Sequence, residues 1–312
     1  MSFKTNSTYC SIITSNYFFY AKALYDSLEK NCKNFSFNLL VVDNNEQLSS
    51  YKGIQIINLL SIKNALPDDY EKIEKYENDK ESTLRWALKP ILLKYLVSKC
   101  SYNKAIFLDP DLFFYENSNF LFDLLDNNDV LITPHWRSKS PFKDRANFNL
   151  LFSEGLYNAG FFGCNSNSTD ILDWWLKMCS YQMKKSEGFY VDQGFLNLFP
   201  IYYSDRVKII THKGCNISNW NRIECQRTLD KNELLINGKF PIVFIHFTNA
   251  TINNIYKGSD KILKPFLELY AKSLKKHNKN FKFKFEINAD TKNKKSLIKK
   301  ILIRLKLQKL NL

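Results

Sequence analysis

Two aspartates one residue apart, Asp109 and Asp111, directly follow the apolar run at residues 105–108. Side chains at positions i and i+2 of an extended chain point to the same side, so the two carboxylates converge. At the end of a buried strand they repel each other unless a cation lies between them. Mn²⁺ and Mg²⁺ take carboxylate oxygens and share their remaining positions with substrate phosphates. The pattern therefore predicts a divalent-metal site, with a turn that leaves both acids in solvent as the alternative.

A histidine, His246, lies in a second apolar run at residues 242–247, where burial disfavours a charged imidazole. A neutral imidazole binds Mn²⁺ as well as softer metals. Together with the two aspartates, His246 is therefore expected to be the third protein ligand of the metal. The alternative is a neutral histidine that packs in the core.

The elements that position these residues are expected to form an α/β fold with an open, mostly parallel sheet flanked by helices. Apolar runs alternate with amphipathic stretches over the first 135 residues, which is typical of β-α-β units. Ligands of such sheets bind at the carboxyl ends of the strands. Strands are predicted over residues 9–14, 37–42, 54–59, 105–108, 130–133, 157–164, 207–210 and 242–247. Helices are predicted over residues 17–31, 83–99, 120–126 and 168–183, with a short helix in the loop 67–80 and a further loop over 142–155.

The positive charge of the chain is concentrated at its C-terminal end. The 312 residues carry a formal net charge of +14, but residues 272–312 hold 14 of the 45 basic residues and 2 of the 31 acidic ones, a net +12. Residues 1–271 are therefore nearly neutral, at +2. A protein that binds nucleic acid needs its basic surface on the folded domain, so we expect no nucleic-acid partner.

Cysteine usage and the N-terminal sequence favour the cytosol. The seven cysteines are scattered and include no Cys-x-x-Cys pair, as expected of reduced thiols rather than of a zinc site or a thioredoxin-like motif. Residues 1–14 lack the charged and apolar regions of a signal peptide. No apolar window reaches the roughly 18 residues that cross a bilayer. We therefore expect a cytoplasmic protein.

A series of motifs over residues 105–249 resembles one known family. In chain order they are FLDPDLFFY, LITPHW, LYNAGFFGCN, a helix with two adjacent tryptophans, VDQGFLNLFP, CNISNWN and FIHFTN. With TSNYFFYAKALYDSL and LRWALKPILLKYL upstream, residues 9–250 resemble bacterial glycosyltransferases of the GT-A fold related to the glycogenin-like family-eight enzymes. The resemblance implies a hexosyltransferase-like enzyme with a nucleotide-diphosphate-sugar donor, a UDP-sugar. The implied acceptor is a glycan or lipid-linked glycan in lipopolysaccharide, lipooligosaccharide or capsule biosynthesis.

The resemblance also implies roles for particular residues. The metal, Mn²⁺ or Mg²⁺, would be held on the donor diphosphate by Asp109, Asp111 and His246. The rest of the donor would be bound by Thr14, Asn16, Tyr17, Asp43, Arg85, Lys89 and Lys257. The residues implied beside the reacting carbon are Asn158, Asp192 and Gln193. The residues assigned to the acceptor side are His135 and Trp136, for both of which a structural role is the favoured alternative.

Three of these assignments leave alternatives open. Arg85 and Lys89 are one helical turn apart and share a helix face, which meets either the phosphates and acids or solvent. Asp192 holds sugar hydroxyls, stabilises an oxocarbenium-like centre or acts as a base. The alternative is a cap for the following helix, which is compatible with each of these roles. After His246 the chain has HFTNATINNIYKG, where the family has a Gly and a Lys-Pro-Trp. Lys257 is therefore a displaced equivalent of the phosphate-binding lysine, and stereochemistry stays open, with retention favoured.

Two other classes of protein share parts of this pattern. A sugar-1-phosphate nucleotidyltransferase has the parallel sheet, but it needs a glycine-rich phosphate loop after the first strand, where this chain has TSNYFFY. An inactive relative that binds glycans or nucleotide sugars would have the same sequence features. An activity screen against nucleotide sugars distinguishes these alternatives.

Residues 291–312 are expected to be a separate element after a glycosyltransferase domain at residues 1–290. Its stretch KKSLIKKILIRLKLQKL combines seven basic residues with an aliphatic helix face made of Leu297, Ile298, Ile301, Leu302 and Leu305. A basic amphipathic helix lies in the headgroup region of an anionic membrane, at about 1 kcal/mol per basic residue. We expect peripheral binding at the inner face of the cytoplasmic membrane, with a solvated charge run as the alternative.

Deletion of residues 291–312 is expected to leave soluble donor hydrolysis unchanged, because every proposed catalytic residue precedes residue 260. The deletion is expected to remove binding to anionic vesicles. That binding should fall steeply as salt rises, since charges are screened over about 8 Å at physiological ionic strength. Co-sedimentation of both chains with anionic and neutral vesicles measures this. Equal partitioning of the full-length and truncated chains would contradict the membrane role.

Overall fold

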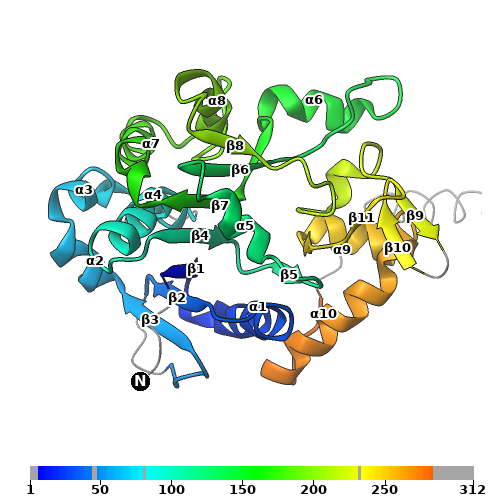
Figure 1. The fold of residues 1–312 in the computed structure, drawn as a ribbon, viewed down its shortest axis with the longest axis horizontal. Helices are drawn as coiled ribbons and strands as arrows, with labels where there is room; N and C mark the ends of the chain where they lie inside the picture. Colours follow the sequence, from blue (N-terminus) through cyan, green and yellow to red (C-terminus); the bar gives the residue numbers. More distant parts are fainter. Residues whose placement is uncertain (1–5, 44–47, 80–81, 231–232, 284–312) are drawn as a thin grey trace, which may run out of the picture. The chain divides into compact units, whose positions relative to one another are not determined.

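A seven-stranded sheet is the framework of the fold (Figure 1). The computed structural model describes residues 6–43, 48–79, 82–230 and 233–283. From one edge to the other, the strands are β3 (Ile54–Asn58), β2 (Ser36–Val41), β1 (Ser7–Ile13), β4 (Lys104–Leu108), β7 (Tyr157–Asn165), β6 (Val130–Pro134) and β8 (Val207–Ile209). Strand β7 runs antiparallel to β4 and β6, and the other neighbouring pairs are parallel. The mostly parallel α/β sheet is therefore confirmed.

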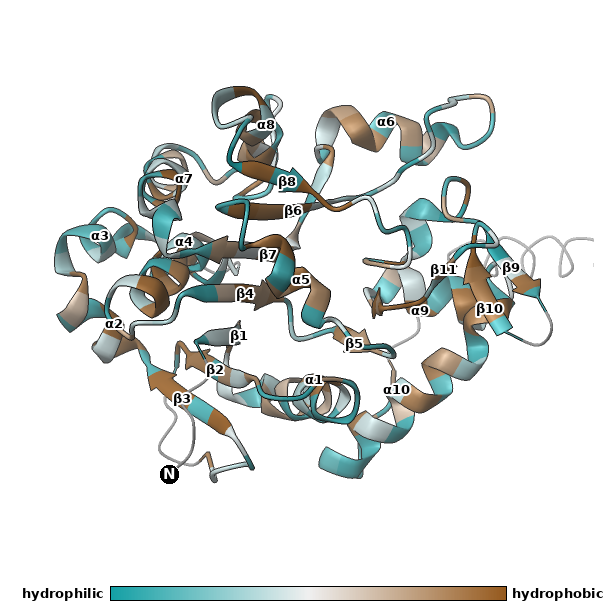
Figure 2. Ribbon diagram, in the orientation of Figure 1, coloured by the Kyte–Doolittle hydropathy of each residue, from teal (hydrophilic) through white to brown (hydrophobic). Residues whose placement is uncertain are grey.

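Helices cover both faces of this sheet. The helices that lie close to the predicted ranges are α1 (Phe18–Asn31), α4 (Thr83–Ser98), α5 (Asn119–Leu124) and α7 (Thr169–Tyr181). Successive side chains of β4 alternate between the faces: Ile106 and Leu108 pack on the side of α1 and α5, while Ala105 and Phe107 pack on the side of α4 and α7. Burial of apolar surface on both sides holds the layers together. Figure 2 shows hydrophobic residues gathered on strands β6 and β8.

A second, two-stranded sheet joins distant parts of the chain. It consists of β5 (Leu112–Phe114) and β12 (Phe244–His246), which run antiparallel with His246 opposite Leu112. The backbone N–H of Phe247 also donates to the Asp111 carbonyl at 2.9 Å. The strand predicted over 242–247 is thus shorter than expected, because its pairing is limited by the three residues of β5.

The predicted loop over residues 142–155 was wrong, because it contains helix α6 (Arg145–Ser153). The helix begins at Asp144, whose carboxylate accepts a hydrogen bond from the Asn147 backbone N–H at 3.1 Å and from the Asn147 side-chain amide at 2.8 Å. A side-chain cap satisfies donors that the first turn leaves free. The polar and aromatic composition of residues 142–155 does not indicate a helix.

The remaining elements lie mostly in the second half of the chain. A three-stranded antiparallel sheet that the sequence did not predict consists of β9 (Arg227–Asp230), β10 (Glu233–Ile236) and β11 (Phe240–Pro241). The other α-helices of the described residues are α2 (Leu59–Ala65), α3 (Pro67–Glu71), α8 (Phe199–Tyr202), α9 (Asn249–Tyr256) and α10 (Lys264–His277).

Chain contacts divide the protein into a unit of residues Met1–Asn280 and a second one of Phe281–Leu312. The predicted amphipathic helix at 291–312, and the boundary at residue 290, lie outside the described residues. Within the described ranges, no helix is long and apolar enough to cross a membrane. All seven cysteines are free, in agreement with the expected thiols.

Candidate active site

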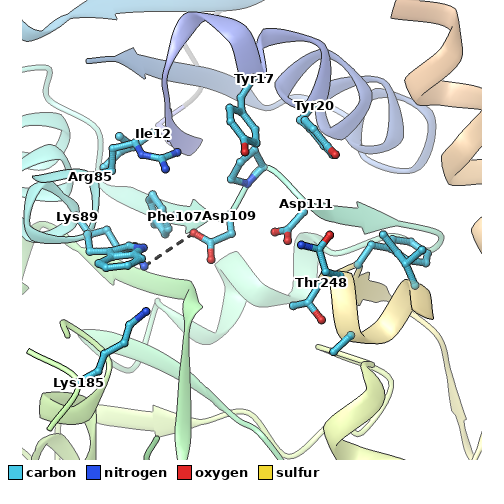
Figure 3. Close-up of a pocket in the computed structure, with 16 residues that line it drawn as sticks. Ile12, Tyr17, Tyr20, Arg85, Lys89, Phe107, Asp109, Asp111, Lys185 and Thr248 are labelled. Carbon is cyan, nitrogen blue, oxygen red and sulfur yellow. Dashed lines mark ion pairs between the residues drawn. The ribbon is translucent and has the colours of Figure 1, made fainter. Parts of the chain in front are cut away.

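Three strands bring the predicted metal ligands together. Figure 3 shows two of these ligands, Asp109 and Asp111. Asp109 follows the end of β4, Asp111 precedes β5, and His246 ends β12. One ligand atom from each of the three residues lies within 4.8 Å of the others. The His246 Nε2 is 3.0 Å from Asp111 Oδ1 and 4.0 Å from Asp109 Oδ2. The β5–β12 pairing therefore turns a two-carboxylate motif into a three-residue cluster.

A glycine of the neighbouring strand leaves room for this cluster. Gly160 on β7 accepts a hydrogen bond from the Asp109 backbone N–H at 2.8 Å, so its Cα lies against the site. A Cβ at this position would be 2.6 Å from the His246 ring, 2.7 Å from Asp109 Oδ2 and 2.8 Å from Asn158 Oδ1. Any other residue at position 160 would therefore displace the three side chains.

Burial and neighbouring charges shift the pKa values of all three side chains of the cluster. Burial, assisted by Asp111, raises the pKa of Asp109 despite the attraction of Lys89. Burial also opposes ionisation of Asp111, but the nearby His246 lowers its pKa. Burial disfavours the imidazolium of His246, yet Asp111 and Asp109 outweigh it and raise the pKa of the imidazole. A divalent cation would relieve the repulsion between the two carboxylates.

A buried lysine lies behind the aspartates. Lys89 of α4 is 3% exposed, and its ammonium is 3.0 Å from Asp192 Oδ2 and 3.8 Å from Asp109 Oδ1. It also donates a hydrogen bond to the Ala159 carbonyl at 3.0 Å. Burial opposes its charge, but the two carboxylates prevail and raise the pKa of the ammonium. This helix face was expected to meet either the phosphates and acids or solvent. The side chain of Lys89 faces the carboxylates of Asp109 and Asp192.

Asp192 belongs to a strained and buried segment. Its carboxylate is almost fully buried, and burial raises its pKa despite the attraction of Lys89. The Asp192 carbonyl accepts a hydrogen bond from Trp175 Nε1 at 3.0 Å. Val191, just before it, has a φ of +42°, which is costly for a β-branched residue. Backbone strain of this kind collects at functional sites, where the surrounding structure holds it in place.

Amide groups connect the other predicted catalytic residues. The Asn158 side-chain amide donates to Gln193 Oε1 at 3.3 Å and lies 3.4 Å from His135 Nε2. The Nδ1 atom of His135 is 3.1 Å from the Gly155 carbonyl, which fits a protonated Nδ1 and an accepting Nε2. Burial lowers the pKa of His135, which keeps its ring neutral. These three side chains therefore form one neutral network.

Two cavities meet at the aspartates. The larger has a volume of about 660 Å³ and the smaller one of about 350 Å³. The larger also contains Tyr17 and Arg85, and the smaller contains Asn158, Asp192 and Gln193. The residues that line both cavities are Trp86, Lys89, Asp109, Asp111, Lys185 and Thr248.

The other predicted donor residues, Thr14, Asn16, Asp43 and Lys257, are not among the residues that line either cavity. Thr14 donates to the Asn16 side chain at 2.5 Å. The Asp43 carboxylate accepts from the Ser15 N–H at 2.7 Å and the Ser15 hydroxyl at 2.8 Å, which ties the end of β1 to the end of β2. Lys257 is exposed after the end of α9 and is not among the residues that line either cavity.

Two tryptophans, Trp136 and Trp220, differ in their position relative to the cavities. Trp136, predicted on the acceptor side, has a left-handed φ of 52° and lies under the Lys213 ammonium, outside the lining of both cavities. Trp220, to which no role was assigned, lines the smaller cavity. Its ring meets the edges of His135 and His246, at centroid distances of 5.2 and 5.4 Å. The CNISNWN motif carries this tryptophan, but only the tertiary fold places it between the two histidines.

Two solved structures are similar to this protein in fold. The galactosyltransferase LgtC, in complex with donor and acceptor sugar analogues, matches with a TM-score of 0.51 at 17% identity, over 85% of this chain and 95% of LgtC. The apo form of mouse xyloside xylosyltransferase 1 has a TM-score of 0.49 at 15% identity, over 78% of this chain and 98% of that one. The likeness to LgtC shows that the fold is that of the GT-A glycosyltransferases.

Residues 10–251 match glycosyl transferase family 8, and the chain belongs to this family. It is therefore a glycosyltransferase. The uncharacterized protein YfnF of Bacillus subtilis strain 168 is 27% identical over 269 residues, which cover 80% of this chain and 83% of YfnF. The family named from the sequence motifs is thus confirmed.

Replacement of Gly160 by Ala is expected to weaken Mn²⁺ binding by about 10–100-fold, because groups that shape a metal site change affinity by that amount. Gly163→Ala is the matched control, since it lies on the same strand but its Cβ would meet only the Leu131 side chain, at 3.1 Å. Titration of Mn²⁺ against both variants, with thermal unfolding in parallel, measures the effect. Wild-type Mn²⁺ affinity in Gly160→Ala would show that the cluster does not bind the metal.

Proposed function

We propose that this glycosyltransferase transfers a sugar from a UDP-sugar to a glycan or lipid-linked acceptor, with a divalent cation bound at Asp109, Asp111 and His246. The observation that carries the proposal is the position of this cluster where two cavities meet. A UDP-sugar donor consists of a nucleoside, a diphosphate and a sugar, in that order. We therefore assign the larger cavity to the nucleotide, the cluster to the diphosphate and the smaller cavity to the sugar.

The three side chains of the cluster fit Mn²⁺ or Mg²⁺. Carboxylate oxygens suit both ions, and an imidazole is a suitable ligand for Mn²⁺. The side chains of Asp109 and Asp111 are 31% and 32% exposed and face the cavities, so phosphate oxygens can reach the remaining coordination positions. The ion would be held by Asp109, Asp111 and His246, and its charge would stabilise the departing diphosphate.

Aromatic and cationic side chains of the larger cavity suit a nucleotide. The rings of Tyr17 and Tyr20 stack at 5.4 Å, and Tyr17 is 40% exposed. The Arg85 guanidinium lies 5.7 Å from the Tyr17 ring centroid. Bases stack on aromatic rings, and guanidinium groups bind phosphates. We assign Tyr17 to the base or ribose and Arg85 to the phosphates.

The smaller cavity supplies groups for the sugar. Asn158 and Gln193 are amides that can exchange hydrogen bonds with hydroxyl groups, and each is less than 10% exposed. Asp192 carries a carboxylate that stabilises positive charge developing at the reacting carbon. The Lys89 ammonium fixes the position of that carboxylate. Asp192 is therefore our choice for the residue nearest the reacting carbon.

We further propose that the enzyme retains the stereochemistry of the donor. Inversion needs a base that is free to take a proton from the acceptor hydroxyl. The carboxylates lining the smaller cavity are Asp109, Asp111, Glu154 and Asp192. Each already has a cationic or imidazole partner: Lys89 for Asp109 and Asp192, His246 for Asp111, and Arg137 for Glu154. Among the described residues, no carboxylate that lines the smaller cavity is therefore free to act as such a base.

The acceptor is proposed to be a surface glycan or its lipid-linked precursor, met at the cytoplasmic face of the membrane. Support comes from the net charge of +12 over residues 272–312 and from the aliphatic pattern of the tail sequence. The near-neutral charge of residues 1–271 gives no support to nucleic acid as a partner.

Asp109→Asn, Asp111→Asn and His246→Ala are each expected to weaken Mn²⁺ binding and to lower donor hydrolysis, for the aspartates by roughly 100-fold or more. EDTA should abolish hydrolysis and Mn²⁺ should restore it. Mn²⁺-dependent hydrolysis of a panel of nucleotide sugars, together with metal titrations, measures this. Asp123→Asn, an exposed aspartate of α5, is the control. Full activity in EDTA would contradict the metal assignment.

Asp192→Asn is expected to lower turnover by roughly 100-fold or more while the affinity for UDP stays within a few fold of wild type, because the carboxylate faces the sugar rather than the diphosphate. Asp173→Asn is the control, since this α7 carboxylate also pairs with a lysine of α4, Lys94, but lines neither cavity. Steady-state hydrolysis and UDP binding are measured for both. Wild-type turnover of Asp192→Asn would place the reacting carbon elsewhere.

A further inference from the structure

The cationic side chains that line the larger cavity differ in their interaction partners. They are Arg85, Lys89 and Lys185. The charge of Lys89 is matched by Asp192 and Asp109, and Arg85 donates a hydrogen bond to the Ser82 hydroxyl. Within the described part of the chain, no carboxylate pairs with Lys185. Its ammonium is instead 4.7 Å from the ring centroid of Trp86 and 5.6 Å from that of Tyr190.

The position of Lys185 is set by the base of a loop. The Val191 N–H donates to the Lys184 carbonyl at 3.2 Å and closes this loop next to Asp192. The turn itself is made at Glu187 and Gly188, which have φ angles of 56° and 83°. Lys185 therefore lies next to the hydrogen bond that closes the loop and not in the turn at the tip of the loop. Figure 3 shows its side chain extending toward the space below Lys89 and Asp109, opposite Tyr17.

The charges of the site leave a role for such a cation. Two carboxylate ligands, Asp109 and Asp111, cancel the charge of a divalent ion, and Asp192 cancels that of Lys89. A nucleoside diphosphate carries one more negative charge once the sugar has left. Positive groups at the diphosphate stabilise that state more than the donor. A lysine held only by aromatic rings can turn to a phosphate without losing a carboxylate partner.

We propose that Lys185 binds the diphosphate of the donor and stabilises it as it leaves. The proposal rests on the proposed function, since it presupposes a nucleotide-diphosphate donor in the larger cavity. Lys185 lines both cavities. A group that binds near the bond between diphosphate and sugar has to reach both, because the proposed binding mode puts the nucleoside in one cavity and the sugar in the other. Lys257, to which the family resemblance assigned the phosphate, is exposed beyond α9 and lines neither cavity. The phosphate-binding lysine is thus supplied by the loop before Asp192.

Lys185→Gln tests this assignment, with Lys184→Gln as the matched control, because Lys184 is the exposed neighbour that lines neither cavity. Calorimetry on the full chain with saturating Mn²⁺ measures the binding of UDP and of uridine. We expect Lys185→Gln to bind UDP about tenfold or more weakly, since hydrogen bonds to charged groups contribute at least that much. Uridine binding should not change, and Lys185→Arg should keep most of the UDP affinity.

A loss of affinity for UDP alone, absent from the Lys184→Gln control, supports the proposal. An equal loss for UDP and uridine would overturn it, because Lys185 would then act on the shape of the cavity. Wild-type UDP affinity of Lys185→Gln would also overturn it, while the proposed function would stand. Failure of the wild-type protein to bind UDP would remove both the proposed donor and this role of Lys185.

Discussion

The site depends on the ion pairs that the buried ammonium of Lys89 forms with Asp109 and Asp192. Asp109 and Asp192 are both held where burial raises the pKa of their carboxyl groups, and Lys89 lies within 4 Å of each. Loss of one partner from a buried ion pair costs about 3–5 kcal/mol, because a charge is left without compensation. The apolar stripe of α4 that packs on the sheet fixes this ammonium in place. The same ammonium joins Asp109, a proposed metal ligand, to Asp192, the proposed catalytic carboxylate.

The second constraint is the pairing of strands far apart in the chain. β12 brings His246 against β5, and β7 brings Gly160 against the end of β4. Neither contact involves sequence neighbours, yet both are needed before Asp109 and Asp111 become part of a three-residue cluster with open space around it. The two cavities share the aspartates of this cluster. In the proposed binding mode, one ion would contact the diphosphate while the sugar lies in the smaller cavity.

The sequence predicted those parts of the fold and site that follow local patterns. Asp109 and Asp111 were singled out because an apolar run ends just before them, and α1, α4 and α7 were predicted because apolar residues recur at helical spacing. The equally long α10 was not predicted. Helix α6 was missed, since it rests on the Asp144 cap and has no buried stripe. Lys185 and Trp220 were missed because their positions in the site come from a loop closure and a tertiary contact, which spacing along the chain does not encode.

The central claim is that Asp109, Asp111 and His246 hold a divalent ion between the two cavities. A crystal structure of the protein with Mn²⁺ and UDP, with anomalous data for manganese, tests it most directly. The predicted result is one strong anomalous peak at roughly 2.0–2.3 Å from an oxygen of each aspartate and from His246 Nε2, with UDP phosphate oxygens completing the coordination. A manganese peak elsewhere, or UDP bound in the larger cavity with no peak at these three residues, would contradict the account.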